Sequence, residues 1–488
     1  SALRNDGSST FGPADRRHSF LKFSAAWEFS KLYASKFMNF GKLRFAYGQA
    51  GDEPNVYTIF SGYRSPSLFS AGEKVNLGLT YNGVTGYRSD DEVSNFRIRP
   101  ERRHEYEMGA DISLFDGSMG ISTTIYNAIN NDVIYNIDVT PSTGADEMTA
   151  NGASIGNKGI ELTIDYRAID TEKIKWDSKL IFAANKNTVL EMNGITGNMA
   201  KSMNQDLVPS RGIAKFSEVS PGREYAEFKV LSWARFGYGI VVDHDLNINT
   251  PDVNIDTLRA YSWSKNDVYV ADNGLPIMYS QKIWSGYAPN PDWTGSFFNE
   301  VSIGKKIKLG CLVDLSIGGH IANYTKNALY EWGTHADTDK RYHPDFDNPD
   351  WYGYEENVST NWGKGKFQNL LNHGHKSIGP GQDTIITYSQ NFYENYMGRN
   401  TDVINNIEDA SYAKLREISI SYNFGKINNS YLGDPNIVVR LSAQDLLTWT
   451  NYSGWDPETN MYQDRISGED YFNQPQTWRA NLAFQLNW

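Results

Sequence analysis

Large apolar and polar residues alternate along many short segments of this chain. From residue 160 to 166 every second residue is Ile, Leu or Tyr, and the residues between them are polar or charged. The same alternation recurs at residues 21–29, 307–317, 418–424 and 478–488. A period of two predicts a β-strand with one apolar and one polar face. We count roughly 13 or 14 such segments and no helical spacing of comparable length, which predicts an all-β fold.

The predicted connections alternate between very short and very long. Tight turns are expected at residues 115–118, 170–173 and 304–306. Long irregular loops are expected at about 49–100, 127–152, 187–221, 246–287, 318–408 and 445–476. Such loops are unusual in a compact soluble domain, whereas a membrane barrel combines short periplasmic turns with long outer loops. A soluble β-sandwich also alternates, but the loop asymmetry favours a transmembrane antiparallel β-barrel.

The composition indicates that strands, rather than helices, would cross the membrane. The mean hydropathy is -0.54 and the apolar runs are short, so no membrane-spanning helix is expected. Aromatic residues make up 14% of the chain, as interfacial aromatic belts require. The net charge of -12 argues against nucleic acid as a partner. The single cysteine, Cys311, excludes an intrachain disulfide and a Cys-rich zinc site.

Several motifs resemble one family. The stretches ALRNDGSSTFG, KLRFAYGQAGD, NGASIGNKGIELTI, DASYAKLREISISYNFG and VVRLSAQDLLTWTNYSGWDPE follow one another along the chain. They resemble, in the family's order, the C-terminal barrel portion of the SusC-like (RagA-like) TonB-dependent outer-membrane transporters of Bacteroidetes. Gln444-Asp445 and Asn487-Trp488 depart from the family's pattern.

The resemblance implies a 22-stranded barrel of which residues 1–488 would form the C-terminal portion, with a plug domain and TonB box upstream. It further implies TonB-dependent import of an oligomeric nutrient, a glycan or a peptide, in the outer membrane, with the long loops facing outside. A SusD-like surface lipoprotein would act as the lid, and TonB would act through the missing N-terminal part. The alternative is a non-transporting barrel scaffold in an outer-membrane machine.

Candidate metal and catalytic residues are few. Two acidic stretches could hold structural calcium, namely Asp243, Asp245 and Asn247, and Asp345, Asp347 and Asp350. An EF-hand loop starting at Asp243 would need Gly and Glu where Ile248 and Asn254 stand, so solvated loops are favoured. His373 and His375 have no recognisable third ligand. No G-x-S-x-G elbow is present, and neither a cofactor nor an enzyme activity is predicted.

Aromatic residues in two long loops are the candidate contacts to substrate or lid, because aromatic rings bind both sugars and peptide side chains. They are Trp332, Tyr342, Trp351, Tyr352, Tyr354, Trp362, Trp449, Tyr452 and Trp455. Packing of these rings within the loops themselves is an equally good explanation.

Overall fold

The protein is described by a computed structural model. It describes residues 1–192, 217–230, 283–336, 406–426, 435–459 and 468–487, with single positions or short breaks inside 14–91 and at 146, and the pairs 269–270 and 375–376. Within these residues no helix has the length and hydrophobicity that crossing a bilayer requires.

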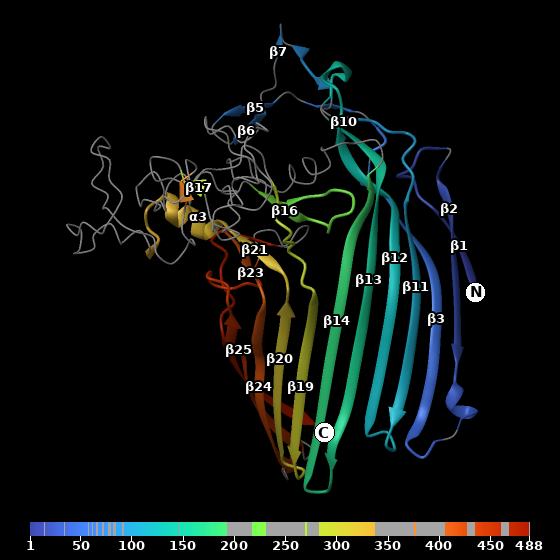
Figure 1. Ribbon diagram of the computed structural model, residues 1–488, viewed down its shortest axis with the longest axis vertical. Helices are drawn as coiled ribbons and strands as arrows, with labels where there is room; N and C mark the ends of the chain where they lie inside the picture. Colours follow the sequence, from blue (N-terminus) through green and yellow to red (C-terminus); the bar gives the residue numbers. More distant parts are fainter. Residues whose placement is uncertain are drawn as a thin grey trace, which may run out of the picture.

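One large sheet forms the body of the molecule (Figure 1). Twelve of its 13 described strands follow one another in chain order, each antiparallel to the next. They are β1 (Ala2–Gly7), β2 (Arg17–Trp27), β3 (Met38–Asp52), β11 (Glu101–Leu114), β12 (Met119–Asp138), β13 (Glu147–Asp170), β14 (Ile174–Met192), β19 (Trp293–Ile303), β20 (Ile307–Ile317), β24 (Tyr412–Lys426), β25 (Asn436–Thr450) and β27 (Arg479–Asn487). The all-β, antiparallel prediction is confirmed.

The remaining elements are short and lie mostly in the connections. They are η1 (Phe29–Lys31), β4 (Tyr63–Arg64), β5 (Ser67–Ser70), β6 (Glu73–Asn76), β7 (Thr80–Tyr81), β8 (Val84–Thr85), β9 (Arg88–Ser89), β10 (Glu92–Val93), η2 (Pro141–Thr143), β15 (Ser217–Glu218), β16 (Glu227–Val230), β17 (Tyr269–Val270), β18 (Ile283–Trp284), β21 (His320–Asn323), α3 (Tyr324–Glu331), β22 (His375–Lys376), β23 (Ile407–Asp409) and β26 (Glu469–Asp470). β10 joins the large sheet by a parallel pairing with β13.

The large sheet has different connections at its two ends. The tight turns after β11, β13 and β19 lie at one end, together with residues 28–37 between β2 and β3, and the longest connections lie at the other end, which we call the loop end (Figure 1). The turn after β11 is built from three consecutive residues with positive φ, Phe115, Asp116 and Gly117. Successive positive φ values match the right-handed twist of the flanking strands and so permit a tight hairpin.

The expected loop at 127–152 is corrected by the structure. β12 continues to Asp138 and β13 begins at Glu147, and the two strands remain paired to that point. The polar run around Asn130 resembles a turn in the sequence. In the structure it contains a register shift, with Asp132 at a φ of 56°, after which pairing resumes at Val133. A bulge therefore interrupts the alternation without ending the strands.

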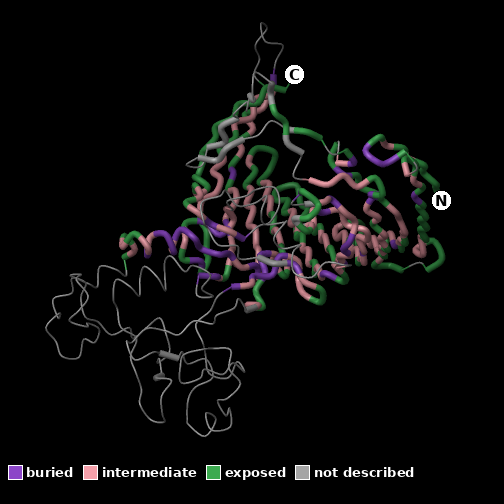
Figure 2. The backbone as a smooth tube through the Cα atoms, turned by 90° about the horizontal axis from the view of Figure 1, so that it is seen from above, coloured by how far each residue is buried: buried purple, intermediate pink, exposed green. Residues whose placement is uncertain are grey.

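One face of the large sheet is apolar across its whole width. Strand pairing places apolar residues of neighbouring strands opposite one another on this face. The pairs include Ile125 with Ile160, Leu180 with Phe297, Leu309 with Ile420, and Leu441 with Leu482. These side chains are exposed, Ile125 by 58%. In Figure 2 most of the strand backbone is likewise intermediate or exposed. An exposed apolar face of this extent is typical of a sheet that faces lipid.

The opposite face carries polar pairs that run from strand to strand. Arg44 Nε lies 2.9 Å from Asp111 Oδ2, and Lys308 Nζ lies 2.8 Å from Glu300 Oε1. Arg440 pairs with Glu417 in the same way. In the described part of the chain β1 pairs only with β2 and β27 only with β25, so these strands form an open wall. The total of 22 strands stays a prediction.

Gly159, in the NKG motif of β13, leaves room for an aromatic ring. The Tyr126 ring lies across it and its hydroxyl donates to Asn185 Oδ1 at 3.0 Å. A Cβ at Gly159 would lie 2.4 Å from the tyrosine ring and 2.6 Å from the Ala184 carbonyl oxygen. The glycine therefore allows a tyrosine of the neighbouring strand to cover the backbone.

Replacing Gly159 by alanine is expected to destabilise the folded protein by about 1–3 kcal/mol, the usual cost of overpacking. The thermal unfolding midpoint of the full-length protein in detergent measures this effect. Gly120→Ala is the matched control, because its Cβ would meet nothing closer than 3.9 Å. Equal midpoints for the two variants would contradict the steric explanation.

Candidate functional site

Only part of the predicted loop site lies in described residues. Trp332, Trp449, Tyr452 and Trp455 are described. The other aromatic candidates, Tyr342, Trp351, Tyr352, Tyr354 and Trp362, lie outside the described residues, as do all six calcium candidates and His373. In the described part of the chain no group of three or more His, Cys, Asp or Glu side chains could hold a metal ion.

The four described aromatic residues have different surroundings. Trp449 lies on β25, two residues from Leu447, which pairs with Leu415 on the apolar face. It is therefore placed like an interfacial aromatic near the loop end. Tyr452 is buried, and its hydroxyl donates to Asp470 Oδ2 at 2.6 Å.

Apart from Trp449 on the apolar face, two of the candidates have an exposed ring. Trp332 follows α3, is 58% exposed, and stacks on Phe472 with ring centroids 5.4 Å apart. Trp455 is 77% exposed. Contact of these two rings with a ligand or a partner stays a prediction.

A buried ion cluster fastens the connection after β25 to the strand wall. Lys414 on β24 is only 2% exposed, and its Nζ lies 2.7 Å from both Asp456 Oδ1 and Glu458 Oε2. Asp456 Oδ1 also accepts from the backbone N–H of Glu458 at 3.0 Å. The Asp-Pro-Glu turn therefore presents both carboxylates to one ammonium group.

Arg416, two residues along β24, joins further segments. Its guanidinium lies 2.7 Å from Asp314 Oδ2 on β20 and 3.2 Å from Asp445 Oδ1 on β25. It also pairs with Glu458 and donates to Gln476 Oε1 at 3.1 Å, just before β27. Burial raises the pKa of the Glu458 carboxyl, but its bonds to Arg416 and Lys414 outweigh this effect and lower the pKa below its ordinary value.

A polar cavity lies beside this cluster. Its volume is about 1060 Å³, and its lining includes Arg416, Asp445, Glu458, Gln476 and Arg479. The ion cluster was missed as a candidate site by the sequence analysis. The signal was present, since the KLR and DPE motifs both belong to the family resemblance, but nothing in the sequence says that the two motifs touch.

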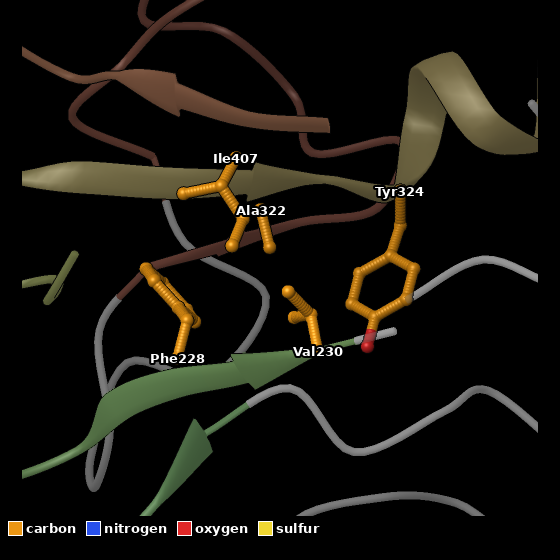
Figure 3. Close-up of a cluster of buried hydrophobic side chains, with 5 residues drawn as sticks. All are labelled: Phe228, Val230, Ala322, Tyr324 and Ile407. Carbon is orange, nitrogen blue, oxygen red and sulfur yellow. The ribbon is translucent and has the colours of Figure 1, made fainter. Parts of the chain in front are cut away.

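The long connections after β20 and β25 form a small sheet at the loop end, which we call the loop sheet. It consists of β23, β21 and β26, in that order. One face, the apolar face of the loop sheet, packs on β16 through the cluster drawn in Figure 3, which comprises Phe228, Val230, Ala322, Tyr324 and Ile407. Tyr471, directly after β26, packs against this cluster, so the connections after β14, β20 and β25 share one hydrophobic core.

The polar face of the loop sheet bears hydrogen-bonding side chains. Asn323 caps α3 by accepting from the Lys326 N–H at 2.8 Å, and Lys326 Nζ lies 2.8 Å from Glu408 Oε1. Asp470 accepts from the Thr325 hydroxyl at 3.2 Å and from the Tyr452 hydroxyl. The helix, the loop sheet and the connection after β25 are thus fastened together.

Glu469 makes this assembly dependent on pH. It lies on β26 opposite Ala322, beside the apolar cluster, and burial raises the pKa of its carboxyl to about 7. When folding raises the pKa of an acid, the contribution of that acid to stability is greatest at low pH. This contribution is lost as the pH rises from the ordinary pKa of the carboxyl to its raised pKa of about 7. We expect Glu469→Gln to protect the loop sheet from proteolysis at pH 8 and to have little effect at pH 4.5. Equal protection at the two pH values would contradict this.

Comparison with known proteins agrees with this architecture. Residues 2–299, more than half of the chain, match the family model described as TonB dependent receptor-like, beta-barrel. TonB-dependent receptor P3 of Formosa agariphila is 24% identical over 99% of this chain and 43% of its own length. TonB-dependent receptor SusC of Bacteroides thetaiotaomicron is 23% identical over 39% of this chain and 19% of its own length.

Solved structures show the same fold. The RagAB peptide importer in its 'open-open' state superposes with a TM-score of 0.65 at 17% identity, covering 100% of this chain and 44% of that chain. Receptor P3 and the RagAB importer each match nearly the whole of this chain, and the chain spans less than half of their length. The resemblance to SusC-like receptors is confirmed, and the chain belongs to the TonB-dependent receptor-like β-barrel family.

Proposed function

We propose that this chain forms part of the transmembrane wall, and the outer loops, of a TonB-dependent importer in the outer membrane. Its cargo is an oligomeric nutrient, a glycan or a peptide, which is captured together with a SusD-like surface lipoprotein. The observation that carries the proposal is the asymmetry of the large sheet. An exposed apolar face that runs across the large sheet is joined to its longest loops at one end, on a chain of the TonB-dependent receptor family.

The two faces and the loop end would then have separate roles. The apolar face contacts lipid, and the polar face lines the lumen, where charged side chains pair across strands. The exposed rings of Trp332 and Trp455, together with the polar cavity beside Arg416, are the surfaces at which cargo or lid would bind. Rings and amide groups suit polar oligomers, which have both apolar faces and hydrogen-bonding edges.

The proposal assigns no covalent chemistry to this chain. The relatives are named as receptors, and one of the similar structures is a peptide importer. Import needs binding, release and an external source of energy rather than a catalytic group. A structural calcium ion in either acidic stretch stays a prediction, and no cofactor is proposed.

Uptake in cells tests the proposal. Deleting the gene for the full-length protein should abolish growth on one class of oligomeric nutrient, supplied as a panel of defined glycans and peptides. Collapse of the proton gradient, which would energise TonB, should abolish uptake in the parent strain. The lipoprotein lid should co-purify with the tagged receptor. Loss of an envelope assembly with no loss of uptake would favour the scaffold alternative.

A further inference from the structure

A row of polar side chains crosses the apolar face of the large sheet on its loop side. Ile125 on β12 lies opposite Ile160 on β13, and both are exposed. Two residues farther toward the loop end, strand pairing aligns Asn127 with Lys158, and Lys158 with Lys186 on β14. Side chains two residues apart on a strand point to the same face. The two lysines therefore project from the apolar side of the sheet and not from its polar face.

This row lies near the edge of the lipid-facing band. Asn127 is eight residues along β12 from Met119, or roughly 27 Å along the strand. With a strand tilt of about 40° this is a height of roughly 20 Å in a band about 25 Å tall. The row continues to Tyr106 and Tyr47, whose ring centroids lie 4.8 Å apart, and the Tyr47 hydroxyl lies 3.1 Å from His104 Nδ1. Tyrosine and lysine are typical of the level at which headgroups and water begin.

The two ammonium groups lack an anionic partner. Lys158 and Lys186 are directly opposite each other and both are exposed. Like charges in this arrangement destabilise a sheet. Among the described residues neither lysine forms an ion pair. The charge of Lys186 acts on Glu224, but burial and the charge of Asp292 outweigh it and raise the pKa of the Glu224 carboxyl.

Lysines on the other face of the same strand are paired. Lys175 Nζ lies 3.2 Å from Asp170 Oδ1, and Lys179 Nζ lies 3.2 Å from Asp165 Oδ1, both aspartates being on β13. The sheet thus supplies carboxylates to the ammonium groups of its polar face. It leaves the two on its apolar face to be neutralised from outside.

We propose that Lys158 and Lys186 bind the phosphorylated headgroup of a lipid in the outer leaflet, whose acyl chains lie along Ile125 and Ile160. Directly opposite residues have Cβ atoms about 5 Å apart, so one phosphate group can contact both ammonium groups and cancel their repulsion. Lysine binds phosphate as a compact point charge. The inference rests on the proposed function for one point, that the loop end faces outside.

Titration of the full-length receptor in neutral detergent with diphosphoryl lipid A, followed by native mass spectrometry, tests the proposal. The double variant Lys158→Gln, Lys186→Gln keeps both side chains long but uncharged. It should bind this lipid about 30-fold more weakly, the usual effect of two lysines near an anionic membrane surface. The same lipid with its phosphates removed should bind the parent and the double variant equally.

The double variant Lys175→Gln, Lys179→Gln is the matched control, because it removes two charges of the same wall from its polar face. It should bind diphosphoryl lipid A as the parent does. The proposal is overturned if the first double variant binds this lipid as tightly as the parent, or if the two double variants lose affinity equally. It is also overturned if removal of the phosphates leaves the difference between parent and variant unchanged.

A charge reversal separates lipid binding from the stability of the sheet. Lys186→Glu places a carboxylate opposite Lys158, so the thermal unfolding midpoint in neutral detergent should not fall, whereas affinity for diphosphoryl lipid A should fall by about 30-fold or more. A midpoint that falls together with the affinity would assign the lysines to the fold alone and contradict the proposal. Nutrient uptake, which tests the proposed function, is measured separately, so the two can fail independently.

Discussion

Replacing Lys414 by methionine should destabilise the folded receptor by about 3–5 kcal/mol, the usual cost of removing one partner of a buried ion pair. The reason is that Asp456 and Glu458 would remain in the loop without their ammonium partner, and Asp456 is only 5% exposed. We expect the thermal unfolding midpoint to fall, and the connection after β25 to become sensitive to protease.

Two further variants give this prediction its control and its rescue. Lys31 pairs with Glu28 at 2.8 Å, but its side chain is 73% exposed, so Lys31→Met should change stability by less than about 1 kcal/mol. Combining Lys414→Met with Asp456→Asn and Glu458→Gln should recover much of the loss, because no unpaired charge remains buried. If Lys414→Met proved as harmless as Lys31→Met, the ion cluster would not hold the loop.

The second large effect concerns the apolar face of the large sheet. Ile125→Lys is expected to cost about 2–4 kcal/mol, the range for a cation placed near the bilayer midplane on a barrel strand. Ile125 lies six residues along β12 from Met119, or roughly 20 Å along the strand. With a strand tilt of about 40° this is a height of roughly 15 Å, near the middle of a lipid-facing band about 25 Å tall. The folded fraction in the outer membrane, read from the heat-dependent gel mobility of the full-length protein, measures the loss.

Glu161→Lys is the matched control on the opposite face. Glu161 neighbours Ile160, the partner of Ile125, and points to the polar side of the sheet. Its replacement should leave the folded fraction nearly unchanged. In a water-exposed sheet, by contrast, the lysine at position 125 would be as harmless as the one at 161. Equal yields for the two variants would therefore remove the main support for a lipid-facing sheet.

The loop aromatics illustrate where sequence reasoning reached its limit. Trp449 and Tyr452 lie three residues apart in a motif that suggests ligand contact, yet one lies on a strand of the apolar face and the other is buried on Asp470. Composition predicts that aromatic rings gather at the loop end. It does not predict which rings become exposed, because exposure depends on the segment that folds over each ring.

The polar break near Asn130 had a similar outcome. A run of Asn and Asp lowers strand propensity, so the local pattern predicts a loop. The partner strand β13 compensates by pairing on both sides of the bulge at Asp132. Whether a polar run ends a strand depends on the neighbouring strand that pairs with it. The local sequence pattern carries no information about that neighbour.

The sequence by itself determined the strands, their two chemically different faces, the alternation of short and long connections, and the family. The strands and their faces follow from the period of neighbouring residues, since side chains of a strand point alternately to its two faces. The connections follow from the spacing between strands, and the family follows from short motifs. Only the tertiary structure decided that Lys414 and Arg416 meet Asp456 and Glu458, and that two connections form one small sheet against which a third packs. Those contacts join residues about 40 or more positions apart, and such pairings depend on how the intervening chain folds rather than on any local pattern.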